Sequence, residues 1–141
     1  MQIPVLPGDG IGPEITAVTV PVLERLDRRF DLGLRFDVHE VGAGSLKPSG
    51  STLPQPVVAA CRAAEGSAPD IAGQDIANPC ALLISAGMLL GWLGEKHGAD
   101  RFRHAQAALA SLVREPATRT RDLGGTLGTR AFGAALLEKL G

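Results

Sequence analysis

The residues of this sequence that are best suited to chemistry lie in two glycine-rich turns. The first, GDGIGPE at residues 8–14, joins a strand-like run to the start of a helix. Such a turn lets the backbone approach a phosphate closely, and the positive N-terminal end of the helix favours an anion. The glycine spacing, however, differs from the G-x-G-x-x-G fingerprint of dinucleotide sites, because Pro13 and Glu14 follow directly. Taken alone, this motif favours a purely structural turn.

The second turn, GSAPDIAG at residues 66–73, precedes Asn78 and Pro79. A carboxylate such as Asp70, set among small residues, can accept hydrogen bonds from both hydroxyls of a ribose. Ile71 could cover one face of an adenine, and backbone groups near Asn78 could meet its edge. The residues equally allow a turn-forming Asp70 and a helix-capping Asn78. The candidate cofactor-binding residues are Gly66, Ser67, Ala68, Pro69, Asp70, Ile71, Ala72, Gly73 and Asn78.

Outside these turns the sequence shows no pattern typical of a catalytic or metal site. The three histidines and the scattered aspartates lack the spacing of metal ligands. Arg119 and Arg121 flank a later glycine-rich loop and could meet a phosphate, but a solvated loop is favoured. Cys61 and Cys80 lack zinc or redox spacing, and we interpret them as buried free thiols. We therefore assign no catalytic residue and no metal ligand.

Composition limits the classes of partner. The chain has 141 residues, about one domain, with 14 basic and 15 acidic side chains and a net charge of −1. This balance gives no reason to expect nucleic acid or an anionic membrane as a partner. No apolar run approaches the roughly 20 residues of a membrane span. The first residues lack the basic start and apolar segment of a signal peptide, so we expect a cytoplasmic protein.

The first 65 residues predict a β-α-β-α unit. A strand at residues 3–6 leads into a helix that reaches Phe30, with Pro13 at its first helical position. Alternating apolar residues at 34–38 predict a half-buried strand, residues 42–56 a loop, and the stretch that follows a short helix. This order favours parallel pairing of the two strands with a right-handed crossover.

The second half predicts only helices and loops. Asn78 and Pro79 are typical of an N-cap and a first helical residue. The helix over residues 80–93 is apolar on nearly every face, so we expect it to be buried on all sides or to lie in an interface. An amphipathic helix follows over residues 102–113, and Thr129 can cap a last helix. Two strands make a small sheet for so many helices, which indicates that part of a larger fold is missing.

Five stretches together resemble the isocitrate/isopropylmalate dehydrogenase family of β-decarboxylating dehydrogenases. IPVLPGDGIGPE (3–14) resembles the family's opening, and GSAPDIAGQDIANP (66–79) resembles its adenosine-binding loop. Three further stretches resemble its second helix, the helix behind that loop and its C-terminal part: LPQPVVAACRAAE (53–65), ALLISAGMLLGWLG (81–94) and DLGGTLGT (122–129). The resemblance implies NAD-dependent oxidative decarboxylation of a 2-hydroxy acid similar to isopropylmalate, isocitrate or tartrate, with Mg²⁺ or Mn²⁺ as the metal.

The resemblance also implies that a long middle region of the family is absent at the junction of Glu65 and Gly66. That region would supply most of the sheet, the smaller domain, the dimer interface, the substrate-binding arginines, the catalytic tyrosine and lysine, and the metal-binding aspartates. None of these has a counterpart here, so we expect the chain to be inactive alone. The adenosine half of the NAD site is carried over, with Asp70 as ribose ligand and Ile71 as adenine cover, and we expect it to bind NAD weakly.

The fold class predicted is α/β, a fragment of the isopropylmalate dehydrogenase-like fold with a small parallel sheet. Residues 1–141 form a single domain, in which the β-α-β-α segment (1–65) precedes the adenosine loop and three helices (66–141). The expected partners are a nucleotide and a second copy of the chain. The alternative function is a non-catalytic nucleotide-binding or oligomerising interaction module.

Overall fold

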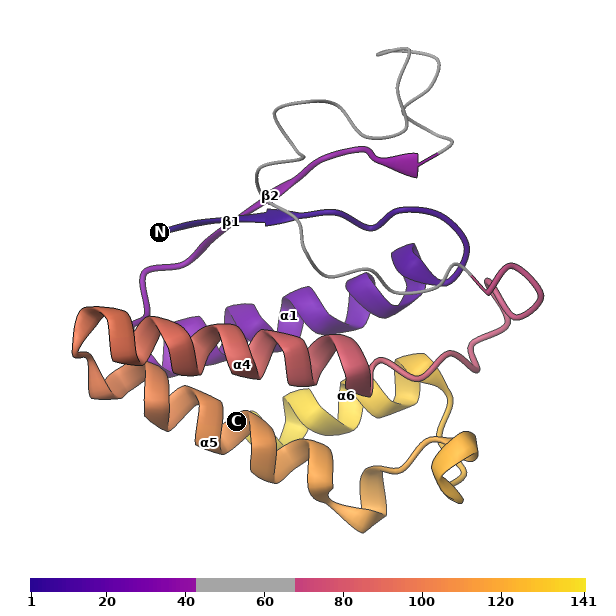
Figure 1. Ribbon diagram of the computed structural model, residues 1–141. Coiled ribbons are helices and arrows are strands. Elements are labelled where there is room, and N and C mark those ends of the chain that lie inside the picture. Colours follow the sequence, from indigo (N-terminus) through magenta and orange to yellow (C-terminus); the bar gives the residue numbers. More distant parts are fainter. Residues whose placement is uncertain (43–67) are drawn as a thin grey trace.

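The described residues run from the N-terminus through a strand, a long helix and a second strand, and later through three helices (Figure 1). This computed structural model describes residues 1–42 and 68–141. Most of the predicted loop over residues 42–56, the short helix predicted after it, Cys61, Gly66 and Ser67 lie outside the described residues. The elements are β1 (Gln2–Val5), α1 (Gly12–Phe30), β2 (Arg35–Val38), α4 (Cys80–His97), α5 (Asp100–Arg114), the 3₁₀ turns η2 (Pro116–Thr118) and η3 (Arg121–Leu123), and α6 (Thr129–Leu140).

The two strands pair in parallel, as the sequence predicts, with Ile3 opposite Phe36 and Val5 opposite Val38. Side chains alternate along a strand, so these four residues share one face of the sheet. Ile3 and Phe36 pack against the hydrophobic core, which holds the sheet on the helices. Val38 is 64% exposed, although the alternation predicts a half-buried residue.

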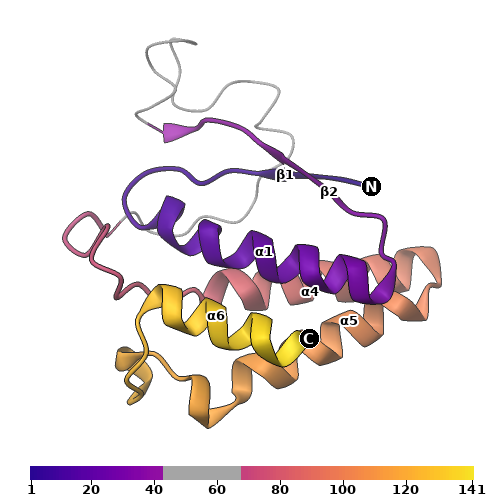
Figure 2. The same ribbon diagram turned by 180° about the vertical axis from the view of Figure 1, so that it is seen from behind.

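The helices form two layers on one side of the sheet. Figures 1 and 2 show α1 and α4 next to the strands, with α5 and α6 on the side of α1 and α4 away from the sheet. The closest helix pairs are α4 with α5 and α1 with α6. The four helices of the described residues all contribute to one core of fully buried side chains, among them Val22, Leu26, Leu83, Leu90, Leu109, Phe132 and Leu136. The predicted mixed α/β architecture with a small parallel sheet is confirmed.

The turn before α1 depends on a close backbone approach at Gly12. A Cβ at this position would lie 1.7 Å from the carbonyl oxygen of Pro7, so no larger residue fits. The helix begins at Gly12, which makes Pro13 the second helical residue and corrects the prediction by one position. Proline is still tolerated there because the first N–H groups of a helix lack intrahelical partners. Glu14 lies in the first turn, where the helix dipole favours a negative charge.

Helices α1 and α6 pack together at Gly133. A Cβ added to this glycine would lie 2.7 Å from Cγ1 of Val18, so the missing side chain is what allows the close approach. At the far end of the pair, Nη1 of Arg29 donates a 2.9 Å hydrogen bond to the carbonyl oxygen of Leu140. The helix that ends the described chain is therefore fixed along the first one.

Helix α4 buries one face against the core and leaves another open. Its buried residues include Leu83, Leu90 and Leu93, whereas Met88 is 68% exposed. The sequence predicts a helix that is buried on all sides or lies in an interface, and in the described part of the chain α4 is buried on one side. No helix of the described residues is long and apolar enough to cross a membrane. We call the exposed apolar residues of this helix, Ile84, Met88, Leu89 and Trp92, the α4 stripe.

Candidate functional site

Residues 68–75, in the segment that resembles the family's adenosine-binding loop, fold as a series of tight turns. The N–H of Ile71 donates to the carbonyl oxygen of Ala68 at 3.2 Å, and the N–H of Gln74 donates to that of Ile71 at 3.2 Å. Nε2 of Gln74 also donates to the carbonyl oxygen of Asp70 at 2.6 Å. Asp70 is exposed, and no bond to its carboxylate is found among the described residues. The turns thus present an accessible carboxylate on an ordered backbone.

Glu14 connects these turns to the start of α1. Its Oε2 accepts a 2.8 Å hydrogen bond from the N–H of Gly73, which is 59 residues away in the sequence. Its Oε1 lies 2.7 Å from Oγ1 of Thr129, which is fully buried at the start of α6. One half-buried carboxylate therefore joins the two glycine-rich motifs of the sequence and the last helix.

Asp75 follows the turns and caps α6. Its carbonyl oxygen accepts from the N–H of Thr129 at 3.1 Å, and its Oδ1 accepts from the N–H of Arg130 at 2.8 Å. The sequence predicts Thr129 itself as the cap, and this is wrong: Thr129 is the first helical residue. Its hydroxyl lies 2.7 Å from the carbonyl oxygen of Ala77 as well as near Glu14. A carboxylate from a distant loop takes the capping role that local sequence assigned to threonine.

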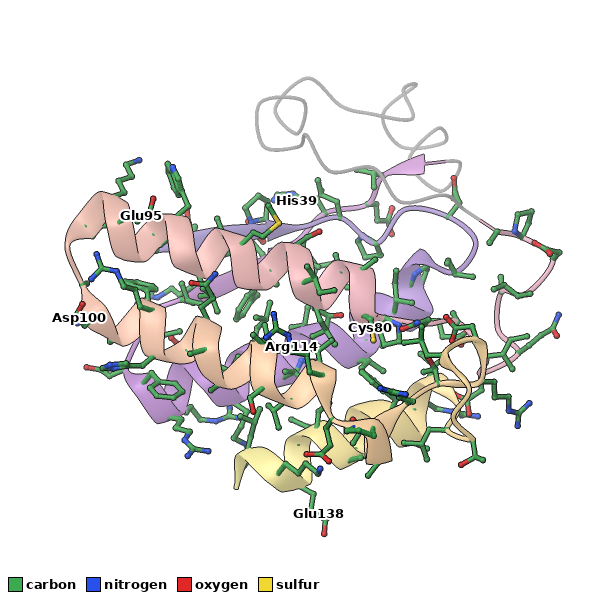
Figure 3. All side chains as sticks on the ribbon, turned by 60° about the horizontal axis from the view of Figure 1, so that its bottom comes forward. His39, Cys80, Glu95, Asp100, Arg114 and Glu138 are labelled. Atoms are coloured by element: carbon green, nitrogen blue, oxygen red, sulfur yellow. The ribbon has the colours of Figure 1, made fainter. Side chains whose placement is uncertain are left out.

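Asn78 links the start of α4 to η3. Its Oδ1 accepts from the N–H of Cys80 at 2.9 Å, and its Nδ2 donates to Oδ2 of Asp122 at 2.7 Å. The helix begins at Cys80, as the predicted range 80–93 has it, but Pro79 rather than Asn78 takes the N-cap position, one residue later than predicted. The Asn78 side chain still satisfies a free N–H at that end. Of the two roles considered for Asn78, the structure supports the structural one for its side chain. Figure 3 shows Cys80 at this end of α4.

The charges of this region are tuned by hydrogen bonds. The hydrogen bond from the N–H of Arg130 lowers the pKa of Asp75, helped by the charges of Arg130 and Arg121. Burial opposes ionisation of Asp122, but hydrogen bonds from Thr120 and Asn78 outweigh it and lower the pKa of that carboxyl. Burial raises the pKa of the Cys80 thiol, and the Asp122 charge adds to this effect. Both aspartates therefore carry negative charge near neutral pH, whereas Cys80 is a buried thiol, as predicted.

A hollow of about 560 Å³ lies between α1 and α6, beside these turns. Apolar residues such as Ala17, Pro21 and Leu137 form its walls, with Glu14 and Arg130 also lining it. Of the predicted site residues that the structure describes, only Gly73 lines this hollow. This hollow is therefore not where Asp70 and Ile71 would receive an adenosine.

The described residues offer no metal site. No group of three or more His, Cys, Asp or Glu side chains among them is arranged to hold a metal ion. The Mg²⁺ or Mn²⁺ that the resemblance implies therefore has no fitting ligand set in the described parts of the chain. We assign no step to a metal.

Sequence reasoning located the turns but missed the residues that hold them. Predicted residues from Ala68 to Gly73 do come together with the start of α1 through Glu14, whereas Asn78 faces α4 and η3. From the sequence, neither Glu14 nor Asp75 is predicted to belong to the site. For Asp122, the sequence pattern that could have indicated its role is the threonine two residues earlier. Oγ1 of Thr120 donates to Oδ1 of Asp122 at 2.6 Å.

The described elements define an α/β protein in which a parallel strand pair packs on helices and two glycine-rich segments meet. The isocitrate/isopropylmalate dehydrogenase family model matches residues 2–65 and 58–136. The chain is 46% identical over 100 residues to an isocitrate/homoisocitrate dehydrogenase of Thermus thermophilus, covering 71% of this chain and 28% of that protein. The chain belongs to the isocitrate/isopropylmalate dehydrogenase family.

Further relatives come from other members of the family. Subunit 2 of the mitochondrial isocitrate dehydrogenase [NAD] of Saccharomyces cerevisiae is 41% identical over 100 residues, 71% of this chain and 27% of the relative. A 3-isopropylmalate dehydrogenase of Synechococcus elongatus is 46% identical over 61 residues, 43% of this chain and 17% of the relative. The chain thus spans less than a third of the length of these curated relatives.

Proposed function

We propose that this chain is an internally shortened dehydrogenase-family protein that keeps the adenosine half of an NAD site and binds NAD weakly. The observation that carries the proposal is the turn of residues 68–75, which holds Asp70 exposed on a hydrogen-bonded backbone. A carboxylate that is accessible and ordered can accept hydrogen bonds from both hydroxyls of a ribose. Ile71, half-buried beside it, offers an apolar surface to an adenine.

The described residues fit the adenosine half of the cofactor in part. Asp70 and Ile71 lie together on the turn, but the Asn78 side chain is engaged by Asp122 and by the N–H of Cys80. Only backbone groups near Asn78 could therefore meet the adenine edge. In a complete enzyme of this family NAD accepts a hydride from the substrate. In this chain the proposed contribution of the residues is to bind and orient the adenosine.

The charges near the turn favour NAD over NADP. A 2′-phosphate at the ribose would bring a negative charge next to Asp70, and no Lys or Arg occurs between residues 66 and 94. The fold does bring Arg130 near the turns, but its Nε lies 3.3 Å from Oδ1 of Asp75 and is paired there. With only half of the cofactor contacted, we expect a Kd on the order of 1 mM.

The internal shortening rests on the way the chain matches its family. The two matched segments meet around residues 58–65, next to the junction of Glu65 and Gly66. The parent reaction would be oxidative decarboxylation of a 2-hydroxy acid, and the family's metal would polarise the forming ketone. Because the described residues lack a metal-binding cluster and the sequence contains no tyrosine, we propose that the chain does not catalyse this reaction alone.

The test is an NMR titration of the full ¹⁵N-labelled chain with NAD, NADP and ADP-ribose. We expect saturable shifts of residues in the 68–75 turn with NAD and ADP-ribose, and weaker binding of NADP. Asp70→Ala should abolish the preference for NAD. Asp37→Ala, which removes an exposed aspartate on β2, is the matched control and should leave it intact. Equal binding of NADP, or unchanged NAD binding in Asp70→Ala, would show that the site does not operate here.

A second candidate function is an oligomerising module that uses the α4 stripe. This helix carries no charged residue from Cys80 to Gly94, and Ile84, Met88 and Trp92 are more than half exposed. Exposed apolar surface of this kind marks interaction sites. A second copy of the chain is the partner proposed, because two uncharged stripes can meet in a self-complementary two-fold contact. A turnover assay detects an active enzyme, and light scattering detects the self-association expected of the module.

A further inference from the structure

The turn that presents Asp70 is held to the rest of the described protein at few points. Between residues 68 and 74 the hydrogen bonds among described residues are internal, apart from the one from the N–H of Gly73 to Oε2 of Glu14. The next attachment is Asp75, which is fixed to the first two residues of α6. Among the described residues, Glu14 therefore provides the attachment nearest to Asp70.

The attachments form a closed frame. Glu14 binds Gly73 on one side and contacts Thr129 on the other, and the N–H of Thr129 in turn donates to Asp75. The frame connects the first turn of α1, the adenosine-like turn and the start of α6. A shift of Glu14 would release Gly73 without breaking the Asp75 cap. The role of Glu14 can thus be separated from the capping of α6.

A count of protons shows how substitutions at Glu14 should differ. Oγ1 of Thr129 lies 2.7 Å from both Oε1 of Glu14 and the carbonyl oxygen of Ala77, but it carries one proton. A glutamine at position 14 would donate from its amide to Oγ1 of Thr129, which would then donate to Ala77. The glutamine oxygen would still accept from Gly73. Glu14→Gln therefore keeps both links, whereas Glu14→Ala and Glu14→Met lose them.

We propose that Glu14 is a positioning residue for nucleotide binding, acting through Gly73 on the turn that carries Asp70 and Ile71. This inference rests on the proposed function. A turn that is already ordered loses less conformational entropy when it binds a ligand. Without its link to Glu14, the turn must be ordered by the nucleotide, and affinity falls. The carboxylate itself need not touch the nucleotide.

The experiment combines two readouts on the full ¹⁵N-labelled chain, hydrogen exchange at the Gly73 amide and the Kd for ADP-ribose. In the unsubstituted protein and in Glu14→Gln we expect a protected Gly73 amide and a similar Kd. In Glu14→Ala and Glu14→Met we expect loss of Gly73 protection and a Kd raised on the order of tenfold. Glu14→Met keeps a long side chain beside the hollow and serves where the alanine variant is too unstable.

Several outcomes would overturn the inference. One is loss of Gly73 protection with an unchanged Kd, and another is a Gly73 amide that stays protected in both apolar variants. If neither apolar variant folds, Glu14 is a stability residue and the inference is wrong. If the unsubstituted chain binds no ADP-ribose, the proposed function fails. The exchange at Gly73 would then still show whether Glu14 holds the turn, so the two failures are distinguishable.

Discussion

Nδ2 of Asn78 donates a 2.7 Å hydrogen bond to Oδ2 of Asp122, 44 residues further along the chain. The contact joins the residue that caps α4 to the 3₁₀ turn before α6. Oγ1 of Thr120 donates to the other oxygen of the same carboxylate, so both oxygens of Asp122 are engaged. This hydrogen bond connects the segment that resembles the adenosine-binding loop with the later glycine-rich loop at residues 122–129. The strength of the hydrogen bond depends on the charge of Asp122.

Asp122 should make stability depend on pH. Its hydrogen bonds lower the pKa of the carboxyl in the folded state below the usual value of 3.8. The folded state thus favours the carboxylate, and this contribution to the free energy of unfolding is present above about pH 4. It is lost as the pH falls through the lowered pKa. Urea unfolding between pH 6 and 3 should show a steeper loss for the unsubstituted chain than for Asp122→Asn.

The control for this prediction is Asn78→Ala, which removes one of the two side-chain donors. The pH-dependent difference between aspartate and asparagine at position 122 should shrink in that background. An equally steep loss in Asp122→Asn would show that the hydrogen bonds do not favour the charged form.

The free energy of unfolding should fall more when Thr129 loses its hydroxyl than when it loses its methyl group. The residue is fully buried, and its Oγ1 lies against Glu14 and the carbonyl oxygen of Ala77. Thr129→Val leaves these buried acceptors without a donor and should lower the free energy of unfolding by about 1–3 kcal/mol. Thr129→Ser keeps the hydroxyl and should cost about 1 kcal/mol for the lost methyl. Chemical denaturation measures both, and a larger loss in the serine variant would contradict the assignment.

Gly133 should not accept a side chain while Val18 is present. Alanine at a helical glycine gains about 1 kcal/mol in helix propensity, but here its Cβ would lie 2.7 Å from Cγ1 of Val18. Overpacking of this kind typically costs about 1–3 kcal/mol, so Gly133→Ala should destabilise the protein. The double variant with Val18→Ala should recover part of the loss. If the two substitutions change the free energy of unfolding additively in chemical denaturation, α1 and α6 are not in contact at this point.

The α4 stripe should cause self-association. Sedimentation velocity of the unsubstituted chain should show dimers or larger species, and Met88→Glu should shift it toward monomer, because a charge in the contact loses its hydration. Leu123→Glu is the matched control, since Leu123 is a 48% exposed leucine on η3 that is not part of the α4 stripe. A monomeric unsubstituted chain, or equal effects of the two glutamates, would rule out the stripe as the interface.

The chain should form no NADH when mixed with NAD, Mg²⁺ or Mn²⁺, and isocitrate, isopropylmalate or tartrate. The reason is that the described residues contain no metal-binding cluster and the sequence has no tyrosine. Absorbance at the NADH band over hours, with a complete family enzyme as the positive control, measures this. Turnover above the blank would restore the enzyme interpretation and remove the case for a non-catalytic module.

Local patterns in the sequence predicted most of the described elements. Apolar residues at helical spacing place α1, α5 and α6, and the strand–turn–helix order predicts the parallel pair of β1 and β2. These features depend on neighbours a few residues apart, which any reader of the sequence can see. Errors of one position at Pro13 and Pro79 fall at helix ends, where boundaries are least sharply determined.

What the sequence by itself determined is therefore the order and type of the elements, the family resemblance and the turn that carries Asp70. Only the tertiary structure decided that Glu14 holds Gly73, that Asp75 rather than Thr129 caps α6, and that α4 is left open on one face. A threonine before a helix fits both a cap and a buried helical residue. The carboxylate of Asp75, which lies in another segment of the chain, provides the cap instead of Thr129. Such long-range contacts leave no local pattern in the sequence.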